Sequence, residues 1–323
     1  MPTTIFERYP KTTLLGLIFL GLCALIVILE IVASTVFGLG KTVLYDTHPV
    51  YGYRPRPNQV VARKTEYMIK TNNYALRAQQ DWDPTDAAHQ ILFLGDSVTY
   101  GGSYISNEQL FSHLATENLS GFIGGNAGVN AWGVNNVCAL IKEMDFIPAN
   151  IYVSVFPEGD FYRGLSRIGG QPFWTRQPRF ALEELFFYFT YKMQLKISPP
   201  TRLDPADKAK VADLTVANLK TMDAFLKANN HYHLIYITPS RSQLLNKAPI
   251  DTALKALFEE FGLEVIYIKD RLGKISPDEV ESLYHDDIHL SAHGHQVWAN
   301  IIMPDLQEIT QFEQTENLMA MKE

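Results

Sequence analysis

Two patches of the sequence, far apart in the chain, carry side chains that could act together in catalysis. Ser97 stands in the stretch 95–99, Gly-Asp-Ser-Val-Thr, which directly follows the apolar run 91–94. Asp286 and His289 form an Asp-x-x-His pattern close to the C-terminus. A serine at the end of a buried strand, a histidine and a carboxylate are the three parts of a nucleophilic triad. The sequence therefore indicates acyl transfer through a serine.

Each of the three side chains has a defined task in such a triad. Ser97 must lose its proton as it attacks a carbonyl, and His289 is the candidate base. Asp286 could hold the imidazole in the right tautomer and stabilise the imidazolium. We expect Ser97 to begin a helix or turn whose N–H groups help to bind the oxyanion. A Gly-Asp-Ser alone is more often a turn or N-cap, so the preceding strand and the late Asp-x-x-His are what favour catalysis.

Further histidines near His289 raise a metal site as an alternative. His289 and His293 are four residues apart and could share a helix face, with His285 and His295 nearby. Ser291, however, has the character of the N-cap of a last helix, which would place His289 on the loop before it. We therefore expect no metal and no cofactor, and we expect His293 and His295 to be surface or packing residues.

The chemistry needs a scaffold, and the pattern from residue 89 onward predicts one. Short apolar strands alternate with helical segments, which argues for a parallel sheet covered by helices on both faces. The expected strands are 91–94, 121–127, 151–156, 234–238 and 264–268, and the clearest helices are 108–118, 134–145 and 291–312. Such sheets bind ligands at the carboxyl ends of their strands, where Ser97 stands.

The segment 14–37 is almost wholly apolar, with Glu30 as its only charge. About 20 apolar residues suffice to cross a bilayer, so we expect an uncleaved transmembrane anchor. A signal peptide cleaved near 32–34, Val-Ala-Ser, is the alternative. Arg8 and Lys11 precede the segment and favour a cytoplasmic N-terminus. We expect a single-pass inner-membrane protein with its globular part outside the cytoplasm, and Glu30 near one end of the helix or packed on a partner.

Charge and cysteine content exclude some classes. The formal net charge of −7 argues against a nucleic-acid partner. Cys23 lies in the apolar segment and Cys138 on an expected helix, so no disulfide framework is indicated.

Two other segments stand outside the alternating pattern. The arm 40–88 reads as polar and irregular, with prolines that block regular ladders and one short strand at 67–72. The segment 161–200 contains an aromatic helix, for which a lid over the site, a surface for a partner or the bilayer, and an insertion packed on the core are all open. We divide the chain into 1–39 (tail and anchor), 40–88 (arm), 89–312 (catalytic domain with the 161–200 insertion) and 313–323 (polar tail).

These motifs together resemble the SGNH, or GDSL, hydrolase superfamily over about residues 89–312. The run 288–295, Ile-His-Leu-Ser-Ala-His-Gly-His, is similar to the last block of that family. The arm is similar to those of membrane-anchored bacterial members. The resemblance implies a flavodoxin-like, three-layer α/β fold and a triad of Ser97, Asp286 and His289.

The resemblance fails in part at the oxyanion hole, which the family completes with a Gly and an Asn. Ala131 stands at the glycine position and still offers an N–H donor. Gly159 stands where the asparagine side chain should be, and loss of one such donor costs about 10²- to 10³-fold in rate. Asn130 could lend its amide instead. Glu158 would oppose an oxyanion if it pointed inward.

Two functions from different classes follow. The first is a membrane-anchored serine esterase or O-acyltransferase that acts on an ester of an envelope glycan or lipid, O-acetyl among them. The second is a catalytically weak or inactive subunit that serves a membrane protein complex. The intact triad positions favour the enzyme, whereas Gly159 and the aromatic segment 161–200 favour the subunit.

Overall fold

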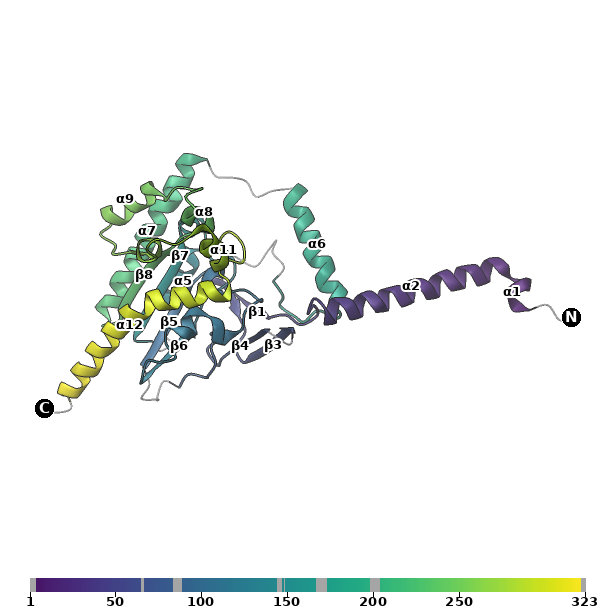
Figure 1. Cartoon of the computed structure of the whole chain (residues 1–323), viewed down its shortest axis with the longest axis horizontal. Coiled ribbons are helices and arrows are strands. Elements are labelled where there is room, and N and C mark those ends of the chain that lie inside the picture. Colours follow the sequence, from purple (N-terminus) through teal and green to yellow (C-terminus); the bar gives the residue numbers. More distant parts are fainter. Residues whose placement is uncertain are drawn as a thin grey trace.

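A five-stranded parallel sheet forms the centre of the protein (Figure 1). The computed structural model describes residues 4–64, 67–83, 89–143, 147, 149–166, 173–197 and 204–320. The strands are β5 (His89–Gly95), β6 (Phe122–Asn126), β7 (Ile151–Pro157), β8 (Tyr232–Thr238) and β9 (Ile266–Tyr267). Their order is β6-β5-β7-β8-β9, with all neighbours parallel. Counted in chain order this is 2-1-3-4-5, the flavodoxin-like arrangement.

Helices cover both faces of the sheet because alternate strand residues point to opposite sides. Leu92 and Leu94 pack with the cluster on one face, whereas Ile91 and Phe93 pack with the cluster on the other. The first face is covered by α5 (Val134–Glu143), α7 (Pro205–Ala228) and α9 (Thr252–Glu260), and the second by α4 (Phe111–Leu114), α11 (Pro277–Leu283) and α12 (Ala292–Ala320). The predicted three-layer α/β fold is confirmed.

Some element boundaries differ from the prediction. The helix expected at 108–118 is a 3-10 turn, η1 (Asn107–Gln109), followed by the short α4, because Leu110 between them is extended. The strand expected at 264–268 is cut short because α10 (Ile268–Arg271) begins at its end. α12 runs on to Ala320 rather than ending at 312, through a stretch with several good helix formers and no glycine or proline after Pro304.

Parts of the expected segments lie outside the described residues: 1–3, 65–66 and 84–88 of the arm, 144–145 of the expected helix, 167–172 and 198–200 of the aromatic insertion, and 321–323 of the tail.

The expectation of an irregular arm was wrong, although the short strand expected at 67–72 is present. The arm contains two antiparallel hairpins, β1 (Tyr45–His48) with β2 (Gly52–Pro55), and β3 (Gln59–Lys64) with β4 (Tyr67–Thr71). Pro55 does not interrupt its ladder because it is the last residue of β2. The arm is also not a loose linker, since several of its aromatic and apolar side chains are buried in the core: Tyr45, Tyr51, Tyr53, Ile69 and Trp82.

Arg77 joins the arm to the segment that follows Ser97. Its buried guanidinium donates hydrogen bonds to the carbonyls of Tyr100, at 2.5 Å, Gly102, at 2.7 Å, and Ile105. A buried arginine is tolerated only where its donors are paired, as they are here. The arm therefore fixes the chain just beyond the candidate nucleophile.

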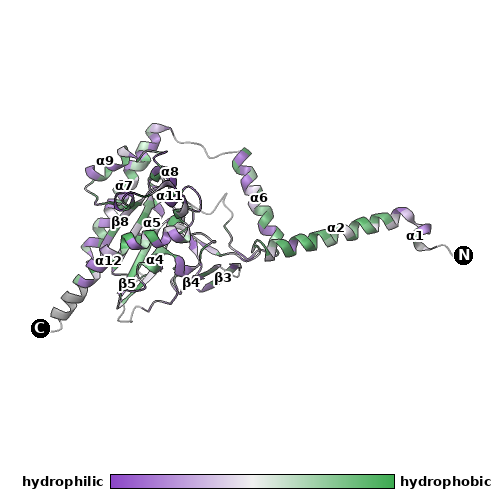
Figure 2. Cartoon of the chain, in the orientation of Figure 1, coloured by the Kyte–Doolittle hydropathy of each residue, from purple (hydrophilic) through white to green (hydrophobic). Residues whose placement is uncertain are grey.

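The apolar N-terminal segment forms one long helix, α2 (Pro10–Thr35), after the short α1 (Ile5–Arg8). By length and composition α2 could cross a membrane: the mean hydropathy of its most apolar 18-residue window is 2.9, and none of that window is buried inside the protein. Figure 2 shows it as a continuous hydrophobic rod that projects from the globular body. Glu30 lies near its C-terminal end, one of the two positions expected for this residue.

Candidate active site

The structure brings the three candidate catalytic side chains into one hydrogen-bonded chain. The Ser97 hydroxyl donates to His289 Nε2 over 2.8 Å. His289 Nδ1 donates to Asp286 Oδ2 over 2.7 Å. Ser97 and His289 are both partly exposed, so a substrate can reach them. This is the order of contacts that a nucleophile, a general base and an orienting carboxylate require.

Local backbone chemistry places Ser97 at the carboxyl end of β5. Asp96 caps the short helix α3 (Ser97–Tyr100) by accepting the Val98 N–H at 2.8 Å. The turn is tight at Gly95, where a Cβ atom would lie 2.2 Å from the Thr99 hydroxyl oxygen and 2.5 Å from the Val155 carbonyl oxygen. Only glycine fits there. The predicted turn or helix start at Ser97 is therefore present.

His289 lies on a short loop that is closed at both ends. Tyr284 and Leu290 form an isolated bridge across it, and the His285 N–H donates to the His289 carbonyl at 2.7 Å. Ser291 then caps the start of α12 by accepting the Gly294 N–H at 3.1 Å. This arrangement puts His289 before the last helix, as its sequence position indicated, and leaves its ring free to face Ser97.

Asp286 is held ionised by its hydrogen bonds. Burial raises the pKa of its carboxyl, but the His289 N–H, the His289 ring and the Ile288 N–H outweigh burial and leave the pKa below its ordinary value. The backbone donors reach Oδ1 at 2.8 and 2.9 Å, which leaves Oδ2 for the imidazole. A negative Asp286 is the form that stabilises an imidazolium.

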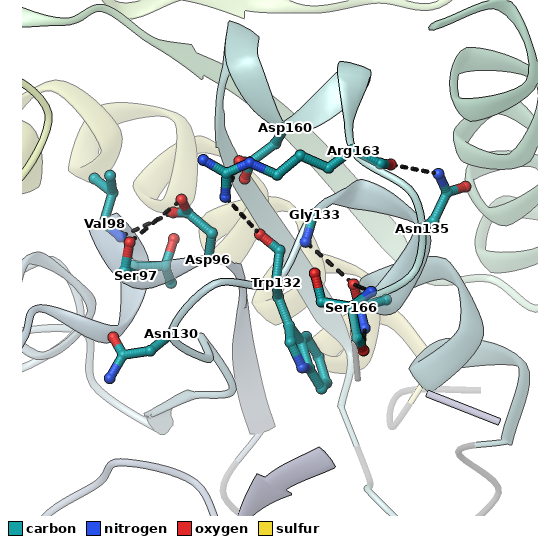
Figure 3. A network of polar contacts seen from close by, with 12 residues as sticks. Asp96, Ser97, Val98, Asn130, Trp132, Gly133, Asn135, Asp160, Arg163 and Ser166 are labelled. Carbon is teal, nitrogen blue, oxygen red and sulfur yellow. Dashed lines mark hydrogen bonds and ion pairs between the residues drawn. The ribbon is translucent and has the colours of Figure 1, made fainter. Parts of the chain in front are cut away.

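Two buried carboxyl groups, those of Asp96 and Asp160, lie close to Ser97 (Figure 3). Asp96 and Asp160 are both fully buried, and Arg163 lies 3.1 Å from the Asp160 carboxylate. Burial, and next the charge of Asp96, raise the pKa of Asp160 well above its usual range, so Asp160 is the member that holds a proton. Arg163 also donates to the Trp132 carbonyl at 3.3 Å. The network ties the turn at Ser97 to the segments around Trp132 and Asp160.

Ala131 adopts a backbone conformation that glycine prefers. Its φ is +61°, in the left-handed region, which explains why a glycine would suit this position. Its N–H makes no hydrogen bond to the residues that the structure describes. The amide of the neighbouring Asn130 lies 3.4 Å from the Tyr45 hydroxyl, and its carbonyl accepts the Tyr53 hydroxyl at 2.7 Å.

Gly159 and Glu158 lie in η2 (Glu158–Tyr162), directly after β7. A Cβ atom built on Gly159 would have no neighbouring atom within 4 Å, so there is open space where a side chain would start. Glu158 is engaged with neighbouring loops, since its carboxylate accepts the Gln243 side chain at 2.5 Å and the Asp251 N–H at 3.0 Å. Glu158 is thus paired rather than free to oppose an oxyanion.

Two observations together decide the fold type. The sheet has the 2-1-3-4-5 order, and a serine after its first strand meets an Asp-x-x-His that precedes its last helix. The chain has the SGNH-hydrolase fold. The α/β-hydrolases differ, because their serine stands in Gly-x-Ser-x-Gly and their acid and histidine lie far apart.

Comparison with known proteins gives distant structural matches. No protein-family model matches the chain, and no curated protein matches it. Similar solved structures include an acetyl xylan esterase (14% identity, 67% of this chain and 98% of that chain, TM-score 0.41). A two-domain esterase active on acetylated mannans matches at 14% identity over 69% of this chain and 49% of that chain, with a TM-score of 0.42. A GDSL-like lipase from Bacteroides thetaiotaomicron matches at 12% identity over 68% and 88%, with a TM-score of 0.38.

The SGNH fold of this chain also holds a second Ser-His-Asp arrangement, which the sequence analysis missed. The Ser154 hydroxyl, on β7, donates to His233 Nε2 over 2.9 Å, and His233 Nδ1 donates to Asp223 over 3.0 Å. Ser154 is completely buried, so no substrate can reach it. Burial lowers the pKa of His233, which keeps its ring neutral. We interpret these residues as a satisfied polar group of the core. This arrangement leaves no sign in the sequence, because Ser154 lies far in the chain from Asp223 and His233 and the three form no short motif.

Two of the other histidines near His289, His293 and His295, are a surface and a packing residue, as expected. His295 is buried and accepts the Phe111 N–H at 3.1 Å, His293 is exposed, and His285 stacks on Tyr104 with ring centroids 4.0 Å apart. No cluster of three metal-binding side chains occurs among the residues that the structure describes.

Ala131→Gly should raise the free energy of unfolding by about 0.5–1 kcal/mol. A left-handed backbone costs an alanine about 1–2 kcal/mol, and glycine removes this cost. Part of the gain is lost because glycine makes the unfolded chain more flexible. Urea unfolding of the two proteins should show a higher midpoint at unchanged slope. Ala127→Gly is the matched control and should lower the midpoint, because the φ of Ala127 is not positive. An equal decrease of the urea midpoint in both variants would contradict backbone strain at Ala131.

Proposed function

We propose that the protein is a membrane-anchored serine esterase or O-acyltransferase. The observation that carries the proposal is the continuous chain of hydrogen bonds from Ser97 through His289 to Asp286, with its serine open to solvent. The order of contacts alone would not carry it, because Ser154, His233 and Asp223 make the same contacts inside the core. The buried Ser154 chain shows the contrast within the same molecule.

The reaction would run in two halves. Ser97 Oγ attacks the acyl carbonyl while His289 Nε2 takes its proton, and Asp286 stabilises the resulting imidazolium. The N–H groups of Ser97 and Ala131 are the proposed donors to the oxyanion. The proton then passes from His289 to the leaving alcohol, which departs and leaves an acyl-Ser97. In the second half, His289 deprotonates water or a sugar hydroxyl, which attacks the acyl group. His289 then returns the proton to Ser97 Oγ as the acyl–Ser97 bond breaks and the acid or the new ester leaves.

We propose an O-acyl ester of an envelope glycan or lipid as the substrate, O-acetyl esters being one case. The anchor α2 would hold the site beside the membrane on the extracytoplasmic side, with the short basic N-terminal tail in the cytoplasm. In this account the chain divides into 1–39 (tail and anchor), 40–88 (arm), 89–312 (catalytic domain) and 313–323 (tail).

The experiment is a turnover assay of the purified full chain in detergent. We expect it to release acetate from 4-nitrophenyl acetate and from acetylated xylan or mannan. Added sugar acceptors distinguish transfer from hydrolysis, because transfer yields a newly acetylated sugar in place of free acetate. A folded protein that turns over none of these esters would favour the alternative, an inactive subunit of a membrane complex. Gly159, in place of an oxyanion side chain, is the observation that keeps this alternative open.

Gly159→Asn should raise kcat for an activated ester by up to about 10²-fold, the value of one oxyanion donor. The open space beside Gly159 and its ordinary φ allow the new side chain. Gly164→Asn is the matched control, since Gly164 also has open space around its Cβ position. An equal response of the two variants would show that Gly159 does not border the oxyanion.

A further inference from the structure

The aromatic helix of the insertion, α6 (Ala181–Ile197), stands apart from the core. Of its residues only Ala181 and Glu184 are buried. Phe186 and Phe189 are 63% and 62% exposed, and Ile197 is 78% exposed. Neither packing on the core nor a closed lid leaves large apolar side chains so open. Figure 1 shows α6 running crosswise from the C-terminal end of α2, separate from the sheet and its covering helices.

The start of α6 is fixed to α2 by the side chain of Glu30. The Glu30 carboxylate accepts the N–H of Ala181 at 2.5 Å and the N–H of Leu182 at 2.9 Å. These are among the N–H groups that a helix start leaves unpaired, and a negative charge there also matches the helix dipole. The only charge in the apolar segment therefore serves as the cap of a second helix.

A second set of contacts holds α6 to the root of the arm. Glu184 accepts the Gly40 N–H at 2.8 Å and pairs with Arg63 at 2.7 Å. Trp174 packs edge-on against Phe187, with ring centroids 5.3 Å apart. The direction of α6 relative to α2 is thus set by several bonds rather than by one.

The free side of α6 carries an apolar stripe. Its members are spaced by three or four residues and therefore share one helix face. They are Leu182, Phe186, Phe189, Met193 and Ile197. Figure 2 shows hydrophobic turns along α6, with hydrophilic turns between them. Lys192 and Lys196, toward its C-terminus, are exposed.

We propose that α6 lies in the headgroup layer of the membrane that α2 spans, with its stripe toward the acyl chains. The proposal rests on the anchor role proposed for α2. Glu30 lies five residues before the end of α2, and at about 1.5 Å per residue α6 begins about 7 Å below that end. Amphipathic helices bury their apolar face about 5–10 Å into this boundary. Such helices carry Trp, Phe and Leu on the apolar face, and their lysines suit anionic lipid headgroups.

The test measures depth with spin labels on the full chain in vesicles of phosphatidylcholine and phosphatidylglycerol. A label at Phe189→Cys, with Cys23→Ser and Cys138→Ser, should collide more with oxygen than with a water-soluble nickel chelate. Leu214→Cys in the same background is the matched control, because Leu214 is apolar and 64% exposed but lies on α7. We expect that label to show the reverse ratio.

A third label separates this proposal from the anchor itself. Cys23 in the Cys138→Ser protein reports on α2 directly and should be the most oxygen-accessible position. If Cys23 lies in lipid and position 189 in water, the proposal for α6 is overturned and its stripe is left for a protein partner. If both labels lie in water, the proposed membrane-spanning role of α2 is overturned as well.

Discussion

Ser97→Ala should reduce kcat for an activated acetyl ester by about 10⁶-fold. Removal of the nucleophile removes the acyl-enzyme route altogether, and what remains comes from binding and the oxyanion donors. The substitution deletes one oxygen that interacts with His289 and, at 3.5 Å, with Asp96, so the fold should be unaffected. The measurement is steady-state turnover together with a thermal midpoint for each protein.

Ser154→Ala is the control that this molecule itself provides. It removes a hydroxyl from an equally complete Ser-His-Asp chain, but one with no access to solvent. We expect it to lower the free energy of unfolding by about 1–2 kcal/mol, because the His233 nitrogen is left without its partner. Its kcat should stay near the wild-type value. Equal losses of activity in the two variants would mean that stability, and not the Ser97 nucleophile, was being measured.

Asp286→Asn should lower kcat by about 10⁴-fold with little change in KM. The asparagine oxygen can still accept the backbone N–H groups of Ile288 and His289, so the loop keeps its shape. Its NH₂ group, however, would meet His289 Nδ1 and favour the tautomer that puts the proton on Nε2, where it cannot accept from Ser97. The loss of the negative charge also leaves the imidazolium unsupported.

Asp287→Asn tests whether the effect belongs to this carboxylate. Asp287 is the next residue, and its Oδ1 accepts the N–H and the hydroxyl of Ser242 at 3.1 and 2.6 Å, away from the histidine. An amide oxygen can accept both. We expect near wild-type turnover from this variant, whereas a loss like that of Asp286→Asn would contradict the assignment of the orienting acid.

The scaffold could be predicted from the sequence because each central strand is a compact apolar run. β5 and β7 are buried on both faces, so their residues read as continuous hydrophobic segments. The motif at Ser97 follows one of these runs directly. Parallel order then puts the carboxyl ends of the strands at one edge, where the late Asp-x-x-His can reach it. Short-range patterns therefore sufficed for the positions of Ser97 and His289.

The features that could not be predicted depend on contacts between distant segments. The hairpins of the arm are short, and their stability comes from burial of side chains such as Tyr53 and Ile69 in the core. The direction of Glu158 is set by partners about ninety residues away in the chain, at Gln243 and Asp251. No local pattern reports such pairings. The same holds for Glu30, whose partner helix begins at Ala181.

The most direct test of the account is the reaction of the folded, purified protein with a fluorophosphonate probe, followed by intact mass and peptide mapping. We predict a single adduct on the peptide that contains Ser97, no adduct in Ser97→Ala, and full labelling in Ser154→Ala. The absence of an adduct on folded wild-type protein, or an adduct that persists in Ser97→Ala, would contradict an activated serine at this site.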